Sequence, residues 1–331
     1  MKQLSIAVPA YNMEALLPTC LDSMADERFC EALEVLIVDD GSKDATARIA
    51  HEYEVRFPQI FRVIEKENGG HGSAVNAALA RSRGRYFRIV DADDWVNTEN
   101  LASLLDILSR TDADMILDEK TEVDAQTFAQ TYFPFPEAMP SGKEVEFECI
   151  SHNEYRYHMA LHTMSVKREI LQAHNIRLLE KTFYVDSQFI TEATAFVRNA
   201  LVLRLPIYYY RVGNAAQSVH YLNYVKRYEE HNRVVKECID FLEKAEFNPS
   251  RAEFVRHSVA LLIHTQYKIA LIFNPDRREG RAQAVRLREM LRAHHPELLR
   301  ATNRRYAEAL LLNRLGIGYE GMEKVKRLLR K

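Results

Sequence analysis

The sequence predicts an α/β protein in which a mostly parallel sheet is flanked by helices and is followed by an all-helical C-terminal extension. Three observations lead to this fold class. Short apolar runs alternate with helix-like segments over the first 120 residues. Runs such as 35–38 are apolar throughout, as in strands buried on both faces. After residue 221 only long helical patterns remain. Strands and helices that alternate at this spacing form βαβ units with right-handed crossovers.

The expected elements follow one another along the first part of the chain. Pro9 ends the first strand, and Pro18 suits the first turn of the first helix. Asp44 is placed to cap the second helix, after a turn-forming cluster rich in aspartate. The expected strands are 4–8, 35–38, 61–65, 85–90 and 115–117. The expected helices are 18–25, 45–56, 74–82 and 97–110.

The chain changes composition at about residue 220. Residues 1–220 hold 22 basic and 33 acidic residues, whereas residues 221–331 hold 23 and 14. We therefore expect a catalytic-type domain over 1–220 and a basic helical extension over 221–331. Asn-Pro and His-Pro pairs separate the helices of this extension. These helices are expected at 223–245, 251–273, 281–293, 303–315 and from 319.

Composition excludes several classes of protein. With 47% hydrophobic and 28% charged residues, the chain has the balance of a folded globular protein. No apolar run is long enough to span a bilayer, and the first residues show no signal-peptide pattern. The four cysteines form no C-x-x-C pair, which argues against a disulfide framework or a zinc site and suits a reducing compartment. We expect a cytoplasmic protein that binds no nucleic acid.

The acidic residues after the fourth expected strand are the sharpest chemical signal. Asp91 and Asp93 stand two apart, so an extended backbone points both carboxylates to one side. Clustered carboxylates repel one another unless a cation lies between them, and Mg²⁺ or Mn²⁺ prefers such oxygen ligands. The pattern predicts a metal site that would hold a diphosphate. The alternative is a solvated acidic turn that caps the helix beginning near Asn97.

Three further segments are candidates, each with a structural alternative. Asp39 and Asp40 follow the second strand, where a carboxylate accepts hydrogen bonds from a base or a ribose; an Asx-type turn is the alternative. The glycine-rich segment 68–72 approaches a helix N-terminus, where N–H groups meet a phosphate; a tight connection is the alternative. Asp186 stands among aromatic residues that would raise its basicity, as suits a general base; a helix N-cap is the alternative.

Neither a histidine metal cluster nor a covalent nucleophile is predicted. The twelve histidines show no ligand spacing, and His71 and His162 are the exceptions by position alone. No G-x-S-x-G elbow or reactive-cysteine context occurs.

Taken in order, these segments resemble family 2 glycosyltransferases with the GT-A fold. The resemblance covers about residues 3–220. The matching residues are 8–12, 38–44, 68–70 with Asn76, 84–86, 91–94, 184–189, and 205–211 with 217–218.

This resemblance implies an inverting, metal-dependent transfer of a sugar from a nucleotide-diphosphate sugar, commonly UDP-linked, to a hydroxyl of a saccharide or lipid-linked saccharide. It implies a role in surface polysaccharide or glycolipid synthesis. It places Mn²⁺ or Mg²⁺ on Asp91 and Asp93, with Asp91 also near the ribose, and it makes Asp186 the general base. It has Pro9 and Tyr11 line the nucleotide base, and it has Asp40 form a hydrogen bond with the uracil. The remaining donor contacts fall on Asn12, Asp39, Asn68 and Gly70, and the resemblance makes Arg211 and Gln217 a clamp on either the diphosphate or the acceptor.

The sequence departs from the family pattern at two places. Val185 precedes Asp186, where the family often has Glu-Asp. The Q-x-x-R-W motif of processive synthases is missing, so we expect one sugar per encounter. Two alternatives remain, a non-catalytic partner subunit and a sugar nucleotidyltransferase. The second would carry a glycine-rich, basic loop after the first strand, where residues 11–14 here read Tyr-Asn-Met-Glu.

The end of the chain, residues 322–331, places basic residues beside apolar ones. Such a segment either rests peripherally on an anionic membrane surface, at its inner face, or packs its apolar side on the protein as a solvated helix.

Overall fold

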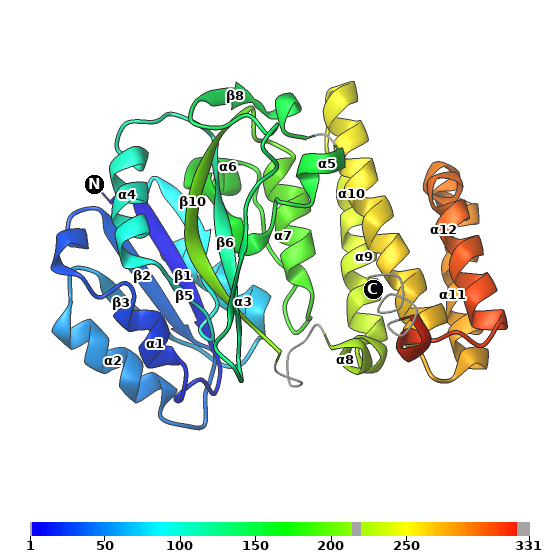
Figure 1. Ribbon diagram of the computed structural model, residues 1–331, viewed down its shortest axis with the longest axis horizontal. Coiled ribbons are helices and arrows are strands. Elements are labelled where there is room, and N and C mark those ends of the chain that lie inside the picture. Colours follow the sequence, from blue (N-terminus) through cyan, green and yellow to red (C-terminus); the bar gives the residue numbers. More distant parts are fainter. Residues whose placement is uncertain (1, 152, 214–219, 323–331) are drawn as a thin grey trace. The chain divides into compact units, whose positions relative to one another are not determined.

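The computed structural model describes residues 2–151, 153–213 and 220–322 (Figure 1). The chain divides into two compact units, Met1–Asn214 and Ala215–Lys331. A ten-stranded sheet with its flanking helices forms the first unit, and the second unit is helical. The predicted α/β fold with a helical extension is confirmed.

The sheet has the strand order β3-β2-β1-β4-β9-β6-β10-β5, with β7 added to β6 and β8 added to β10. Strands β1 to β4 pair in parallel, and β10 runs parallel to β6. The short strand β9 lies between β4 and β6 and is antiparallel to both. The bounds are β1 Leu4–Ala10, β2 Leu33–Asp39, β3 Phe61–Glu65, β4 Tyr86–Ile89, β5 Trp95–Val96, β6 Met115–Asp124, β7 Gln130–Phe133, β8 Glu144–Glu146, β9 Met164–Lys167 and β10 Asn199–Val212.

Helices cover both faces of this sheet (Figure 1). Residues of α1, α2 and α4 share one apolar cluster with alternate residues of β1 and β2, such as Ile6 and Val8. Helix α3 packs against β1 and β2 from the other face. The helical bounds of this unit are α1 Leu17–Asp22, α2 Thr46–Arg56, α3 His71–Arg81, α4 Thr98–Leu108, α5 Asn153–Arg156, α6 Arg168–Ala173 and α7 Val185–Thr194, with 3₁₀ turns at Glu27–Phe29, Phe147–Cys149 and Leu161–Thr163.

Most expected elements of this unit occur within a few residues of their predicted places, with informative differences. Asn97 caps α4 as expected, because its side chain accepts from Asn100 N. Helix α3 begins three residues before the expected start, directly after Gly70, whose φ is +82°. Strand β6 runs to Asp124 rather than to 117, because its second half gains pairing partners in β7 and β10.

The second unit contains the helices α8 Tyr221–Lys226, α9 Tyr228–Lys244, α10 Pro249–Lys268, α11 Arg277–His294 and α12 Pro296–Arg314, and a π-helical turn at Ile269–Phe273 that ends α10. The single helix expected over 223–245 is therefore two helices. Helix α12 begins seven residues earlier than expected, since Pro296 occupies its first turn, where the missing N–H costs nothing.

Among the described residues, none of the helices combines the length and apolarity that crossing a membrane requires. The membrane-surface prediction refers to residues 322–331, of which 323–331 lie outside the described part.

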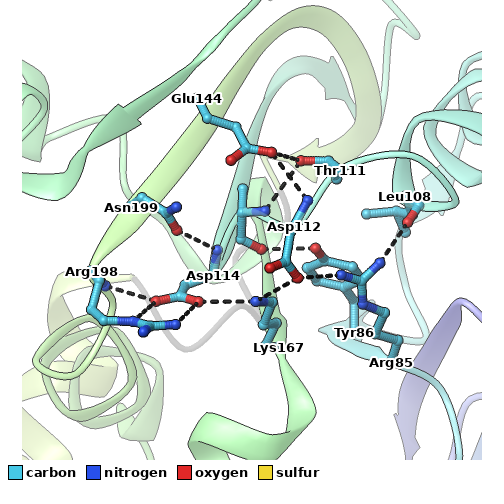
Figure 2. A network of polar contacts seen from close by, with 11 residues as sticks. Arg85, Tyr86, Leu108, Thr111, Asp112, Asp114, Glu144, Lys167, Arg198 and Asn199 are labelled. Atoms are coloured by element: carbon cyan, nitrogen blue, oxygen red, sulfur yellow. Dashed lines mark hydrogen bonds and ion pairs between the residues drawn. The ribbon is translucent and has the colours of Figure 1, made fainter.

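A polar network joins the strand ends that lie opposite the candidate site (Figure 2). Asp114, at the start of β6, has a buried carboxylate that accepts from Lys167 Nζ at 3.1 Å and from Arg198 Nε at 2.9 Å. Its backbone N–H donates to Asn199 Oδ1 at 2.8 Å. Partial burial raises the pKa of Asp114, but the hydrogen bonds from Arg198 and Lys167 outweigh it and hold the pKa below its ordinary value. The neighbouring Asp112 pairs with the same lysine from an exposed position.

We expect Asp114→Asn to lower the free energy of unfolding by about 3 kcal/mol at neutral pH, because it leaves Lys167 without its buried anionic partner. The carboxylate's depressed pKa stabilises the fold above the ordinary aspartate pKa. This contribution begins to be lost as the pH falls below the ordinary aspartate pKa of about 4, so wild type and variant converge only below the still lower folded-state pKa. Urea unfolding at several pH values measures this. Asp112→Asn is the matched control, and its cost should stay below about 1 kcal/mol, as for exposed ion pairs. Equal costs for both variants would contradict the prediction.

Candidate active site

The candidate site lies where β1 has β2 on one side and β4 on the other, so that the strand order reverses. Ligands of such sheets bind outside the carboxyl ends of the strands at this point. The predicted residues Tyr11, Asp40 and Asp91 follow these three strands. The structure therefore gathers the three main predicted segments at one edge of the sheet.

The loops after β1 and β2 are fastened to each other. Asn12 Oδ1 accepts from Lys43 N at 2.8 Å, and Asn12 N donates to Ser42 Oγ at 3.0 Å. Asn12 adopts the left-handed conformation, which asparagine tolerates better than most residues. Tyr11 stays 45% exposed beside this fastening, and Pro9 remains in β1, paired with Val38. The loop thus presents an aromatic ring to solvent on a fixed backbone.

Asp40 is the anchor of the next loop. Its Oδ1 accepts from Lys66 Nζ at 2.7 Å and from Gly69 N at 2.9 Å, and its Oδ2 accepts from Gly70 N at 2.7 Å. Asn68 Nδ2 adds a bond to the Asp40 carbonyl. Asp40 is 3% exposed, so its carboxylate serves the glycine-rich loop.

Asp39, the last residue of β2, is as buried as Asp40, at 4% exposed, but makes fewer contacts. Its Oδ1 accepts from Ser42 N at 3.2 Å. Within the described part of the chain, its Oδ2 accepts no hydrogen bond. One carboxylate oxygen of Asp39 is therefore available to a ligand, whereas both oxygens of Asp40 already accept hydrogen bonds.

The glycine-rich loop leads into His71, the first residue of α3. His71 Nε2 lies 2.8 Å from Asp91 Oδ1, and each side chain is 31% exposed. An ionised carboxylate only accepts, so His71 donates this hydrogen bond. Burial lowers the pKa of His71, but the Asp91 hydrogen bond and the nearby charges of Asp186 and Asp93 outweigh it and set the pKa above its ordinary value. Burial raises the pKa of Asp91, and His71 reverses this to a net decrease.

Asp94, the third acid of the turn after β4, is structural. It is 1% exposed; its Oδ2 accepts from Tyr208 Oη and its Oδ1 from Arg211 N, both at 2.7 Å. The Tyr208 hydroxyl also accepts from Asp91 N at 3.2 Å. The Arg211 side chain donates from Nε to the Asp93 carbonyl and lies over the Trp95 ring, 4.9 Å from its centroid. Strand β10 therefore fixes the acidic turn from the side.

The negative charge of Asp93 is poorly compensated, as is that of Asp94, whose pKa burial and the charges of Asp93 and Asp91 raise well above its ordinary value. Burial, and then the charge of Asp91, raise the pKa of Asp93 to about 6. Such a carboxylate gains from a nearby cation. In the residues that the structure describes, no three histidine, cysteine or acidic side chains converge as metal ligands. Asp91 and Asp93 fit an ion such as Mg²⁺, which proteins commonly bind through one or two carboxylates together with substrate phosphates.

Asp186 lies in the first turn of α7, at its second residue. Tyr184 precedes the helix in the left-handed conformation, with φ +67°, so the backbone turns sharply there. Asp186 is therefore inside the helix and does not cap it. Residue 186 is exposed. Protein atoms nearby nevertheless displace water from its carboxyl group, and this desolvation raises the pKa of Asp186. The negative charge of Asp91 adds to the increase. Asp186 thus shares its electrostatic surroundings with His71 and the acidic turn.

Helix α3 holds the segment that leads to Asp186. Asn76 Nδ2 donates to the Leu178 carbonyl and Asn76 Oδ1 accepts from Leu178 N, both at 2.9 Å. A Cβ atom on Gly72 would lie 2.2 Å from the Leu179 carbonyl oxygen, so only glycine permits this approach. Lys181 N donates to the Gly69 carbonyl. One helix therefore positions both Asp91, through His71, and the approach to Asp186.

The roles of two groups near the site, on Tyr208 and Lys66, were not predicted from the sequence. The hydroxyl of Tyr208 and the amine of Lys66 reach partners that no local pattern indicates. His162, singled out by position, stacks on Tyr210 with 5.0 Å between ring centroids, and burial lowers its pKa to about 3, so the ring is neutral. Gln217 lies outside the described residues.

Comparison with known proteins identifies similar chains. The family model described as "Glycosyl transferase family 2" matches residues 5–167. The uncharacterized glycosyltransferase EpsJ of Bacillus subtilis (strain 168) is 29% identical over 216 residues, which cover 62% of this chain and 60% of EpsJ. Poly(ribitol-phosphate) beta-N-acetylglucosaminyltransferase TarS of Staphylococcus aureus is 27% identical over 263 residues, which cover 78% of this chain and 44% of TarS. The matched part thus spans less than two thirds of either relative.

Solved structures share the fold. The crystal structure of S. aureus TarS 1–349 in complex with UDP-GlcNAc has a TM-score of 0.69 at 20% identity, and the match covers 96% of this chain and 93% of that one. The mannosyltransferase PcManGT from Pyrobaculum calidifontis, in complex with GDP-Man and Mn²⁺, has a TM-score of 0.56 at 16% identity, and the match covers 94% and 86%.

We expect Gly72→Ala to lower the free energy of unfolding by about 1–3 kcal/mol, because the added methyl group displaces the backbone at Leu179. Helix propensity alone would give the opposite sign. Urea unfolding measures the change. Ala80→Gly, at an exposed position of the same helix, is the control and should cost about 1 kcal/mol. A Gly72→Ala variant as stable as wild type would refute the close approach.

Proposed function

Since this chain is a member of glycosyl transferase family 2, we propose that it transfers a sugar from a UDP-linked or related nucleotide sugar to a hydroxyl of a saccharide or lipid-linked saccharide, with inversion and one sugar per encounter. The observation that carries this proposal is the undercompensated carboxylate of Asp93 beside Asp91, at the point where such sheets bind nucleotides. The nucleotide sugars named for the TarS and PcManGT complexes support it.

We place the nucleotide along the ends of β1 and β2. The exposed ring of Tyr11 stacks on the base, beside Pro9 and the fastened Asn12. Asp39, whose Oδ2 is available, accepts from the base N–H in place of Asp40, which the resemblance favoured. Asp40 instead shapes the loop of Asn68 and Gly70, whose backbone borders the donor.

We place the diphosphate near Asp91 and Asp93, with Mn²⁺ or Mg²⁺ held by these two carboxylates. A divalent ion there would neutralise the charge that develops on the leaving diphosphate. Asp91 also lies within reach of the ribose. Arg211, held on the Asp93 carbonyl, adds positive charge at the same edge.

Asp186 is the proposed general base. Inversion by a single displacement needs a base on the face of the sugar opposite the leaving group, so a carboxylate bound to the metal could not serve. Asp186 comes from α7, is open to an incoming acceptor, and has a raised pKa that increases its basicity. It takes the proton from the acceptor hydroxyl as that oxygen attacks the anomeric carbon.

The relatives support a role in cell-surface polysaccharide synthesis, since TarS is named for poly(ribitol-phosphate). We propose that the reaction takes place in the cytoplasm, in keeping with four free cysteines. Contact of the basic helical extension with a membrane stays a prediction.

Replacing Asp186 by Asn should reduce turnover by about 10²- to 10⁴-fold, because the acceptor proton loses its base, while UDP binding stays within about twofold. Release of UDP from a panel of UDP-sugars with Mn²⁺ and candidate acceptors measures this. Asp106→Asn, on the exposed side of α4, is the control and should keep full activity. Turnover that survives in Asp186→Asn would remove Asp186 as the base.

Replacing both Asp91 and Asp93 by Ala should abolish the Mn²⁺-dependent heat of UDP binding, because the ion loses both protein ligands. Titration calorimetry with UDP, with Mn²⁺ and with EDTA, measures this. If wild type binds UDP equally well in EDTA, or if the double variant keeps the Mn²⁺-dependent component, the metal site is placed wrongly.

A further inference from the structure

A chain of contacts connects the end of β2 to the end of β4 through the glycine-rich loop. The Asp40 carboxylate holds the N–H groups of Gly69 and Gly70 from one side. Lys181 N holds the Gly69 carbonyl from the other. Gly70 has a φ of +82°, where a side chain would be strained. The loop is therefore fixed at the residue directly before His71.

This fixed loop determines where the imidazole of His71 lies. His71 begins α3, and its Nε2 donates to Asp91 Oδ1 over 2.8 Å. Within the described residues, Asp91 Oδ2 accepts no hydrogen bond. The Asp91 carboxylate is thus held by one oxygen and open at the other.

We propose that His71 is a positioning residue of this active site, which holds Asp91 so that Oδ2 faces the donor and its metal ion. This inference rests on the proposed function. It assigns to His71 a role toward Asp91 and no contact with the reacting atoms. It also explains the role of Asp40, because the Asp40 carboxylate fixes the backbone of the loop that directly precedes His71.

The position of this pair argues against a purely structural role. Both side chains are about one third exposed, and hydrogen-bonded ion pairs at such positions add little to folding stability. The imidazole also lies within electrostatic range of Asp93 and Asp186. The His71–Asp91 hydrogen bond therefore contributes little to the stability of the fold. Because it lies among the acids of the site, its role is to orient the Asp91 carboxylate.

A matched pair of variants tests the proposal. In His71→Gln the side-chain amide nitrogen reaches the place of Nε2, whereas in His71→Asn it reaches only the place of Nδ1 and cannot contact Asp91. The probe is UDP, titrated calorimetrically into the full-length protein with Mn²⁺ and with EDTA. Melting temperatures of all variants are measured alongside.

We expect His71→Asn to weaken Mn²⁺-dependent UDP binding about tenfold, the size of one well-placed hydrogen bond, and His71→Gln to recover it to within about threefold of wild type. The melting temperatures should stay equal, and the weak binding in EDTA should not change.

Three outcomes overturn the proposal. Affinity of His71→Asn equal to wild type would show that Asp91 needs no holding. A loss of equal size in His71→Gln would show that the hydrogen bond is not what matters. A fall in melting temperature together with weaker binding in EDTA would make His71 a structural residue. Wild type that binds no UDP at all is a separate result, because it refutes the proposed function itself.

Discussion

The end of β4 concentrates three aspartates within four residues, and the surrounding structure is arranged around their mutual repulsion. Each acid is treated differently. Asp94 is buried and bonded to a hydroxyl and an amide, but burial and the other two acids outweigh these bonds and raise its pKa well above the ordinary value. Asp91 faces an imidazole. Asp93 keeps its charge unbalanced, at a pKa raised to about 6. A protein gains no stability from such an arrangement, so the imbalance is explained by a cation and an anionic ligand that complete it.

Helix α3 turns this local imbalance into a geometry suited to group transfer. Its first residue contacts the Asp91 carboxylate, on the proposed donor side, and its second turn holds the segment that leads to Asp186, on the proposed acceptor side. The two acids to which we assign different roles are thus both positioned by one helix rather than by two independent loops. Gly72 makes this possible, because the absence of a side chain brings the Leu179 backbone against the helix. In the proposed reaction, this shared support would keep the distance between the donor and the proposed base Asp186 constant, as displacement at a single carbon requires.

Local patterns sufficed to predict the parts of the structure that local chemistry determines. Apolar runs located β1 to β4, and the acids that follow β2 and β4 marked the candidate site, because both signals lie within a few residues of chain. Contacts between distant residues were not predictable. The four-residue strand β9 enters the sheet between β4 and β6 with no pattern of its own. Tyr208 meets Asp94 across 114 positions, and Lys66 meets Asp40 across 26. Only such long-range contacts show that both Asp40 oxygens bond to the segment 66–70, and that Asp39 is therefore the acid with an oxygen available to a ligand.

Strand β10 has a consequence for motion in the sheet-bearing unit. Its first residue, Asn199, bonds to the start of β6 in the polar network, and Tyr208, near its far end, bonds to the acidic turn. The strand pairs with β6 at nine of its fourteen residues, with shifts of register between Val202 and Tyr208. Loosening the acidic turn from the side of β10 would therefore disturb the same strand that takes part in the polar network at the opposite edge of the sheet, so we expect this wall of the site to resist local opening. On the β1 side the loop backbone is fastened to the loop after β2, so there only the exposed side chain of Tyr11 can change position without breaking these bonds.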